Sequence, residues 1–235
     1  MNIRFIGLNY PGFSYSKSYA GQDFGNVERQ LFSDRLIDEL GISGKIVFMG
    51  HSRACENTLQ TAVERKAHGL VLINPFGLRR HRGISPEYKL RYVTKIYDLL
   101  PKTIADFLIY KIYRSMKFHV HCPEECISAL RSVNDVMLEK QLEFIEKLNS
   151  LENTRILISY AGRDQFIESK IMEECLEKYE NLEALKFQND PDIDQICDVF
   201  GKNAKASVFV KKDDHFQNKS RAEMIARSVQ AILKN

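Results

Sequence analysis

Short apolar runs alternate along this chain with longer segments whose apolar residues recur at helical spacing. Runs of five to seven residues rich in β-branched and aromatic side chains predict buried strands. The predicted strands are residues 45–49, 70–74, 154–160 and 206–210. The segments 53–65 and 220–233 show helical patterns. Strands that alternate with helices are typical of an α/β protein with a mostly parallel sheet flanked by helices.

The middle of the chain has helical patterns only. Ser85, Pro86 and Glu87 form a helix-start signal, after which apolar residues recur at helical spacing up to about residue 100. Two further helices are predicted over residues 103–116 and 123–148. We therefore predict an α/β core formed by residues 1–76 and 153–235, with residues 77–152 inserted as a helical cap.

The candidate chemistry begins at the end of the first of these predicted strands. The sequence Gly50-His51-Ser52-Arg53-Ala54 joins the apolar run 45–49 to the predicted helix 53–65. Small residues two positions before and after a serine allow the sharp strand-to-helix turn that exposes a nucleophilic hydroxyl. Gly50 and Ala54 satisfy this size requirement, and His51 is expected to pack beside the turn as a spacer. Ser52 is thus the candidate nucleophile, although a serine before a helix also commonly caps it.

A nucleophilic serine needs a base and a group that orients that base. Asp164 lies in the loop after the strand 154–160, and His215 lies between the strand 206–210 and the last helix. We predict that His215 is the base and Asp164 the orienting acid. Taken alone, Asp164 would be read as a turn-forming residue and His215 as a surface histidine. Asp213 and Asp214 also neighbour His215, but they are expected to shape the turn.

These residues and their chain order, Ser, Asp, His, resemble the α/β-hydrolase family. The segment from Pro11 to Ser16 (PGFSYS) is similar to the family's P-G-x-G-x-S sequence, with Ser14 in place of the second glycine. Within that family the chain is most similar to an uncharacterised branch described from nematodes. The resemblance implies a serine hydrolase that acts on an ester-like or other small acyl substrate without a metal or organic cofactor. It also implies that the backbone N–H of Arg53 donates to the oxyanion.

One departure from the family bears on activity. In the family, the P-G-x-G-x-S segment follows the fourth strand of an eight-stranded sheet, whereas here the corresponding strand begins at residue 2. We therefore predict an N-terminally truncated sheet in which residues 3–8 pair directly with the strand 45–49. The loop that supplies the family's second oxyanion donor would be lost, and the loop 10–13 is a candidate replacement. Two alternatives to a serine hydrolase remain. One is a non-catalytic binding protein on the same fold, and the other is a chain that does not fold stably.

Composition sets broader limits. The chain has 235 residues, of which 44% are hydrophobic, enough for one domain with a sizeable core. Its 34 basic and 31 acidic residues give a net charge of +3, too small and dispersed to indicate a nucleic-acid partner. The sequence shows neither a membrane span nor a signal peptide. Five scattered cysteines favour reduced thiols, and with them a cytoplasmic protein. The oligomeric state is not indicated.

Three further groups of residues admit a functional and a structural interpretation. Metal-ligand residue types cluster between 119 and 126, but they lack the spacing of a zinc site, and we predict no metal. The basic run 79–82 would attract an anionic substrate or form a solvated face. Four aromatic residues are candidates for a substrate pocket: Tyr10, Phe107, Tyr110 and Tyr113. The last three recur at helical spacing, and an aromatic stripe of that kind is more often part of the core.

Overall fold

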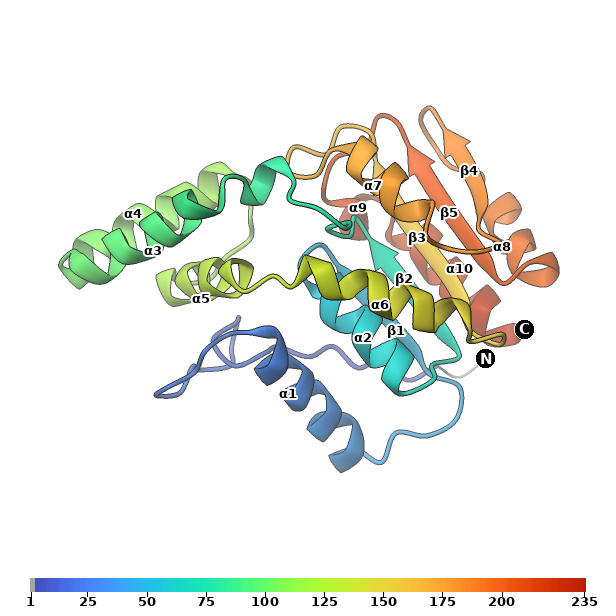
Figure 1. Cartoon of the computed structure of the whole chain (residues 1–235), viewed down its shortest axis with the longest axis horizontal. Coiled ribbons are helices and arrows are strands. Elements are labelled where there is room, and N and C mark those ends of the chain that lie inside the picture. The colour runs from blue at the N-terminus through green and yellow to red at the C-terminus, as the bar shows by residue number, and fades with distance from the viewer. Residues whose placement is uncertain (1–2) are drawn as a thin grey trace. The chain divides into compact units, whose positions relative to one another are not determined.

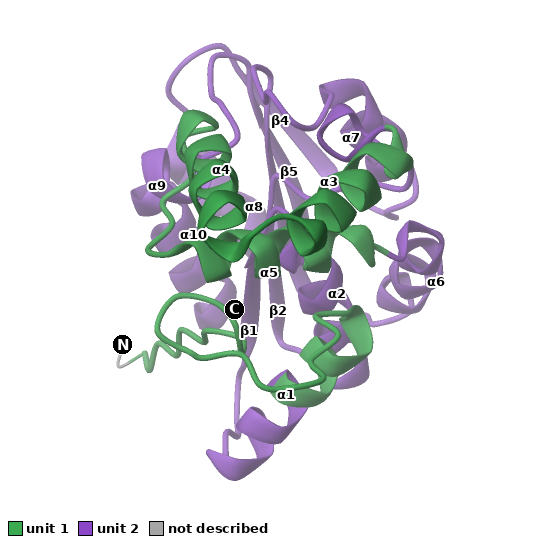
Figure 2. Cartoon of the chain, turned by 90° about the vertical axis from the view of Figure 1, so that its left-hand side faces the viewer, with its two compact units in different colours: residues 1–32, 86–136 green, residues 33–85, 137–235 purple. Residues whose placement is uncertain are grey.

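The computed structural model describes residues 3–235 (Figure 1). The chain forms two compact units (Figure 2), of which residues 1–32 and 86–136 form unit 1 and residues 33–85 and 137–235 form unit 2. The helix α1 (Asn26–Glu39) begins in unit 1 and ends in unit 2.

Unit 2 contains a five-stranded sheet whose paired strands are all parallel. The order across the sheet is β1-β2-β3-β5-β4. The strands are β1 (Val47–His51), β2 (Gly69–Ile73), β3 (Arg155–Ala161), β4 (Glu183–Phe187) and β5 (Lys205–Val210). The four strands predicted from apolar runs are therefore confirmed. The fifth, β4, escaped prediction because it lies at a sheet edge and buries only Leu185.

Helices cover both faces of this sheet. Figures 1 and 2 show α2 (Ala54–Glu64), α6 (Leu138–Asn149) and α7 (Ser169–Leu176) on one face, with α8 (Ile193–Lys202) and α10 (Ala222–Lys234) on the other. Every residue of β2 is buried, as expected for a strand covered on both sides. A hydrophobic core joins β2, β3 and β5 to α8 and α10 through residues such as Val71, Val208 and Ile232.

The topology concentrates the loops that matter for chemistry. The carboxyl ends of parallel strands lie at one edge of a sheet, and ligands of open α/β sheets bind there. Ser52, Asn74 and Gly162 directly follow β1, β2 and β3, and the loop after β5 leads through His215 to the short helix α9 (Gln217–Ser220). The fold thus gathers the predicted serine, acid and histidine at the same edge of the sheet.

The predicted strand at residues 3–8 is wrong. These residues carry no regular secondary structure, and among the described residues β1 pairs only with β2. Ile3, Phe5 and Leu8 are all exposed, Phe5 with 78% of its surface accessible. An extended segment gains stability as a strand only when its backbone pairs and its side chains are covered, and neither condition holds here. β1 therefore remains an edge strand.

Unit 1 is mainly helical. The helices α3 (Glu87–Leu99), α4 (Lys102–Ser115) and α5 (Pro123–Asn134) pack against one another around a small cluster that includes Ile109, Cys126 and Leu130. A short 3₁₀ helix, η1 (Arg82–Ile84), precedes them in unit 2. Helix α3 starts at Glu87 after Pro86, close to the predicted start.

The single helix predicted over residues 123–148 is wrong, because the structure has two helices there, α5 and α6. The break falls at residues 135–137. The carboxylate of Asp135 accepts the N–H of Asn26, and the N–H of Met137 donates to the carboxylate of Glu56 at 2.7 Å. These tertiary hydrogen bonds replace the bonds that a continuous helix would make, and no apolar pattern reveals them in advance.

Candidate active site

Ser52 occupies a strained turn between β1 and α2. Its φ of +55° lies in the left-handed region that residues with a side chain seldom adopt. Its N–H donates to the carbonyl oxygen of Ile73 at 2.8 Å, and its own carbonyl accepts the N–H of Cys55 at 3.0 Å. The turn is therefore fixed both to the neighbouring strand β2 and to the first turn of α2. Strain of this kind persists where the surrounding structure enforces it.

Gly50 is required by the close approach of strand and helix. A Cβ atom at this position would lie 2.4 Å from Oγ1 of Thr58, 2.9 Å from its Cβ and 3.1 Å from the backbone carbon of Ala54. The first two distances are shorter than real Cβ contacts. The size requirement inferred from the sequence thus has a direct cause at the first small position, and Ala54, the other small residue, begins α2.

The structure brings together the three residues predicted from the sequence. Nε2 of His215 lies 2.8 Å from Oγ of Ser52, and Nδ1 of His215 lies 2.7 Å from Oδ2 of Asp164. His215 and Asp164 are buried, with 1% and 7% of their surfaces accessible. The two ring nitrogens therefore each face one partner, in a line from hydroxyl to imidazole to carboxylate.

The carboxylate of Asp164 is held by its own loop. Oδ1 accepts the N–H groups of Phe166 and Ile167 at 2.8 and 2.9 Å, which leaves Oδ2 directed at the imidazole of His215. The same loop is bound from another side, because Nδ1 of His81 lies 2.9 Å from the carbonyl oxygen of Phe166. His81 is buried, and burial lowers its pKa. The turn-forming role and the position beside His215 therefore coexist in Asp164.

The backbone of His215 is also held. Its carbonyl oxygen lies 2.8 Å from Nε2 of His51 and accepts a hydrogen bond of 2.9 Å from Nδ2 of Asn74. Because a carbonyl only accepts, Nε2 of His51 carries the proton. Burial, with a smaller contribution from the imidazole of His215, lowers the pKa of His51 to about 4. His51 thus packs beside the turn as expected, with its ring 4.9 Å from that of His215.

Sequence reasoning missed Asn74 and the hydrogen bonds of His51 and His81. Asn74 is 1% exposed and has a φ of +45°, a conformation that asparagine tolerates better than most residues. Its sequence signal is weak but real, since it is a polar residue directly after four buried apolar ones at the carboxyl end of β2. His81 lies within the basic run 79–82, and the sequence of that run does not distinguish its role from that of the neighbouring arginines.

Asp213 and Asp214 shape the turn before His215. Both carboxylate oxygens of Asp213 bind the guanidinium of Arg221, at 2.7 and 2.8 Å, and Oδ2 also accepts from Gln217. The carboxylate of Asp214 accepts the N–H of Phe216. Neither aspartate makes the contact with the imidazole that Asp164 makes, so the structure distinguishes the three carboxylates.

Arg53 follows the candidate nucleophile with helical dihedral angles, immediately before α2. The backbone N–H of Arg53 lies at the N-terminal end of α2. The Arg53 guanidinium points elsewhere: it forms a buried ion pair of 2.8 Å with Glu56, whose other oxygen accepts the Met137 N–H. The side chain of Arg53 is thus directed at Glu56.

The aromatic residues proposed for a substrate pocket all belong to unit 1. Tyr110 and Tyr113 pack against the buried cluster formed by α4 and α5, and burial raises the pKa of Tyr113. Phe107 is 61% exposed. The ring of Tyr10 lies 5.7 Å from that of Phe32 and under the guanidinium of Arg29. These contacts favour the structural interpretation for Tyr110 and Tyr113.

The loop 10–13 uses two of its backbone donors internally. The N–H of Gly12 donates to Ser16 and that of Phe13 donates to Tyr10, each at 2.9 Å, while Pro11 carries no N–H. Neither Gly12 nor Phe13 can donate to an oxyanion without rearrangement of this loop. This weakens the hypothesis that the loop supplies a second oxyanion donor.

The remaining two candidate groups are residues 119–126 and the basic run 79–82. In residues 3–235, no group of three or more His, Cys, Asp or Glu side chains is placed to hold a metal ion. In the basic run, the guanidinium of Arg79 donates two hydrogen bonds to the carboxylate of Glu174. Nε of Arg82 lies 3.7 Å from Oε1 of Glu168. The cysteines in the described chain are free thiols.

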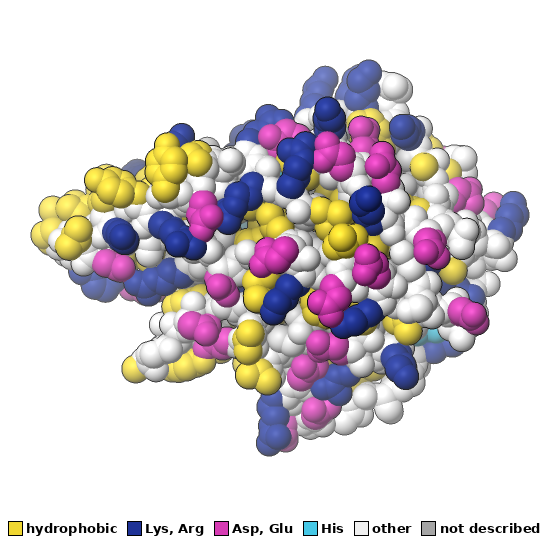
Figure 3. Space-filling model, in the orientation of Figure 1, with side chains coloured by type: hydrophobic (Ala, Val, Ile, Leu, Met, Phe, Trp, Pro, Cys, Tyr) yellow, Lys and Arg dark blue, Asp and Glu magenta, His cyan; other side chains and the backbone are white. Residues whose placement is uncertain are grey.

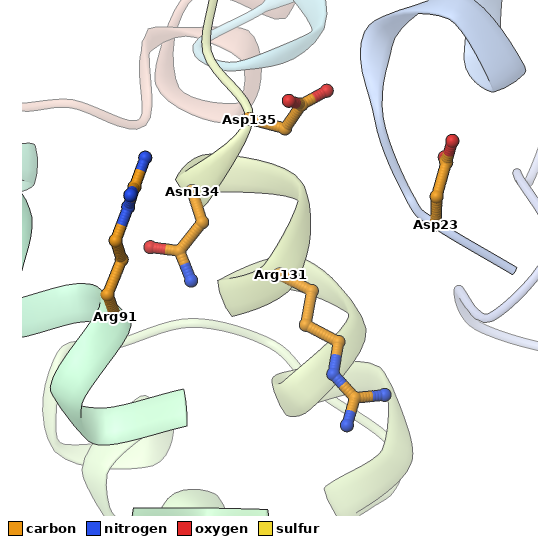
Figure 4. Close-up of a pocket in the computed structure, with 5 residues that line it drawn as sticks. All are labelled: Asp23, Arg91, Arg131, Asn134 and Asp135. Carbon is orange, nitrogen blue, oxygen red and sulfur yellow. The ribbon is translucent and has the colours of Figure 1, made fainter. Parts of the chain in front are cut away.

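A polar pocket of about 350 Å³ lies within unit 1 (Figure 4). Three of its charged side chains have partners: Arg91 pairs with Glu87, Arg131 pairs with Asp98, and the Asp135 carboxylate accepts from Asn26. The second contact joins α5 to α3, and the third joins the end of α5 to the first residue of α1. The pocket is lined by Asp23, Arg91, Arg131, Asn134 and Asp135.

Several solved structures share this fold. A carboxylesterase structure from Nitrososphaera gargenis has a TM-score of 0.60 at 13% identity, covering 96% of this chain and 79% of that one. A thermophilic esterase from Thermogutta terrifontis has a TM-score of 0.57 at 17% identity, covering 95% and 76%. A monoacylglycerol lipase from Paleococcus ferrophilus has a TM-score of 0.54 at 14% identity, covering 95% and 81%. At these identities the likeness shows the fold.

Comparison of sequences identifies the family to which the chain belongs. An uncharacterised protein of Caenorhabditis elegans is 24% identical over an alignment of 249 positions, gaps included, which covers 98% of this chain and 70% of that protein. None of the described helices is long and apolar enough to cross a membrane. The family described as "alpha/beta hydrolase of unknown function (DUF1057)" matches residues 1–234. Since that match spans almost the whole sequence, the chain belongs to this family of alpha/beta hydrolases.

Proposed function

We propose that this protein is a serine hydrolase that cleaves an ester or other small acyl substrate with Ser52, His215 and Asp164. The observation that carries the proposal is the hydrogen-bonded line from Oγ of Ser52 through the imidazole of His215 to Oδ2 of Asp164. The strained φ of Ser52 supports it, because a serine that merely capped α2 would not need a left-handed backbone. The fold shared with esterases and a lipase is consistent with this chemistry.

In the proposed reaction, Oγ of Ser52 attacks the substrate carbonyl carbon while Nε2 of His215 takes the hydroxyl proton. Asp164 keeps the proton of the imidazole on Nδ1 and stabilises the imidazolium that forms. The tetrahedral intermediate collapses to an acyl-enzyme as His215 returns the proton to the leaving group. Water, deprotonated by His215, then attacks the acyl-enzyme, and Ser52 is regenerated with release of the acid. No metal or organic cofactor is required by these steps.

The charge on the intermediate's oxygen needs backbone donors. We assign the Arg53 N–H as one of them, because it follows the nucleophile at the N-terminal end of α2. The hydrogen bonds that Gly12 and Phe13 make inside their loop disfavour a donor from that segment. Loss of one oxyanion donor costs on the order of 10² to 10³ in turnover, so we expect slow hydrolysis of simple esters.

Fluorophosphonate labelling tests the proposal. We expect the folded protein to be labelled, the Ser52→Ala variant to be unlabelled, and Ser150→Ala, which removes an exposed serine, to be labelled like the parent. Thermal melting of all three proteins establishes that they are folded. If the folded parent resists labelling and does not hydrolyse p-nitrophenyl acetate, the protein is a non-catalytic member of the fold and the proposal is wrong.

A further inference from the structure

The helices α3 and α4 of unit 1 expose an unusually large number of apolar side chains. On α3, Tyr88, Tyr92 and Leu99 have 68%, 65% and 85% of their surfaces accessible. On α4, Ile104, Phe107 and Ile112 have 50%, 61% and 46%. Figure 3 shows hydrophobic side chains gathered over α3 and α4, with Lys and Arg side chains beside them. Contiguous exposed apolar surface of this kind usually marks an interaction site.

The exposed residues of α3 form a stripe. At about 100° per residue, Tyr88, Tyr92, Ile96 and Leu99 fall within about 80° of the helix circumference. Leu90 and Tyr97, which pack against the cluster of unit 1, fall on the opposite side. Helix α3 is therefore apolar on two sides. Only one side packs against other helices, and even there no residue of α3 is fully buried. We call the exposed residues Tyr88, Tyr92, Ile96, Leu99, Ile104, Phe107, Leu108 and Ile112 the apolar stripe.

Helix α4 repeats the pattern. Ile104, Leu108 and Ile112 recur every four residues and are all exposed, whereas Ala105 and Ile109 are buried on another side of the helix. The Nζ atom of Lys111 lies 5.7 Å from the centre of the Phe107 ring, so the ammonium group of Lys111 lies beside an aromatic residue of the stripe. Both helices thus present the same mixture of aromatic, aliphatic and basic side chains to solvent.

The segment that carries the stripe has an excess of positive charge. Residues 86–118 contain seven Lys or Arg and three Asp or Glu, an excess of four positive charges. Because the whole chain carries +3, the remainder carries −1. Two of the seven cations are paired, Arg91 with Glu87 and Lys102 with Asp106. In the described structure, Lys89, Lys95, Arg114 and Lys117 form no ion pair, and Lys89 and Lys95 flank the stripe of α3 on either side.

We propose that the apolar stripe of α3 and α4 docks onto an anionic lipid surface. Aromatic and aliphatic side chains that enter the boundary of headgroups and acyl chains, flanked by Lys and Arg that reach the phosphates, are the chemistry of an interfacial helix. A second copy of the chain is a poorer partner, because pairing two such faces would bring their excess positive charges together. Docking does not require Ser52, so it stands independently of the proposed hydrolase activity.

Co-sedimentation with lipid vesicles tests this proposal. Vesicles of phosphatidylcholine alone are compared with vesicles that also contain phosphatidylserine, at low and high salt. We expect the protein to bind the phosphatidylserine vesicles and to bind less as salt rises, because screening weakens the attraction of exposed cations. The Ser52→Ala variant should bind equally well, which separates docking from catalysis.

Two sets of variants locate the binding face. A triple variant, Tyr92→Ser with Leu99→Ser and Phe107→Ser, should lower the partition coefficient by at least about tenfold. Replacing Lys89 and Lys95 by Gln should lower binding to phosphatidylserine vesicles by about fivefold per residue. The matched control is Val27→Ser with Leu31→Ser on α1, since these residues are 63% and 65% exposed outside the stripe. It should bind like the parent.

Three outcomes would overturn the proposal. One is that the folded parent binds neither kind of vesicle. Another is that the triple variant, shown by melting to be folded, binds as well as the parent. The third is that sedimentation velocity shows a dimer which the triple variant dissociates while vesicle binding is absent; the stripe would then belong to an interface between two copies.

Discussion

Nε2 of His51 lies 2.8 Å from the backbone carbonyl oxygen of His215, the residue whose side chain faces Ser52. This hydrogen bond fixes the main chain of His215 independently of its imidazole. His51→Leu should therefore lower kcat for a p-nitrophenyl ester by about tenfold, the equivalent of one hydrogen bond, with KM little changed. His51→Gln retains an N–H donor and should recover part of the loss. Equal losses in the two variants would show that the hydrogen bond is unimportant.

Asp164→Asn tests the orientation of the imidazole. The amide can still offer its oxygen to the N–H groups of Phe166 and Ile167, but its NH₂ group then faces Nδ1 of His215. The imidazole is driven to carry its proton on Nε2, where it can no longer accept the proton of Ser52. We expect kcat to fall by ~10³ to 10⁴ while the loop keeps its shape. Steady-state kinetics and a melting curve measure the two effects, and Asp214→Asn, at an exposed turn, is the control.

The three predicted residues come together because their positions are set by strand ends. Ser52, Asp164 and His215 each follow an apolar run that folds as a parallel strand, and parallel strands carry their carboxyl ends to one edge of the sheet. The local signal at Ser52 is also strong, since the contacts that surround Gly50 exclude a larger side chain. Spacing and residue type were sufficient for these three residues.

The errors have a different origin. Residues 3–8 look like a strand, but a strand exists only where a partner pairs with it, and the sequence of the segment does not contain that partner. The break between α5 and α6 depends on Asn26 and Glu56, which lie far away along the chain. The roles of Asn74 and His81 likewise rest on tertiary hydrogen bonds to the loops that hold His215 and Asp164. Patterns within one segment cannot indicate such contacts.

Gly50→Ala should destabilise the protein by about 2 kcal/mol, because the new methyl group overlaps Thr58 and the backbone of α2 has to move. The same movement should displace Ser52 and reduce fluorophosphonate labelling. Urea unfolding measures the change in the free energy of unfolding. Gly201→Ala is the matched control: no atom lies within 4 Å of its Cβ position, and it should stabilise α8 by about 0.5 to 1 kcal/mol. A Gly50→Ala protein as stable as the parent would contradict the steric explanation.

Ser52→Gly should be more stable than Ser52→Ala by about 1 kcal/mol, because glycine adopts the φ of +55° without the steric cost that a Cβ imposes. Both variants lose the hydroxyl and its contact with His215, so their difference isolates the backbone strain. Urea unfolding of the two proteins gives the difference directly. If alanine is tolerated as well as glycine, the turn at residue 52 is not strained in solution.

His51 should make the free energy of unfolding depend on pH. Burial lowers its pKa from an ordinary 6.5 to about 4, so the unfolded chain binds a proton below about 6.5 that the folded chain does not bind until about 4. The unfolded state therefore holds more protons in this window, and stability falls as pH falls through it, with a slope of up to about 1.4 kcal/mol per pH unit from this group.

His81, whose pKa burial also lowers, adds to the same fall in stability. His51→Gln removes only the first contribution, so its free energy of unfolding should depend less steeply on pH than that of the parent. Urea unfolding at several pH values between about 7 and 5 measures both slopes. Parallel curves for the parent and His51→Gln would mean that His51 accepts its proton as readily in the folded protein as in the unfolded chain.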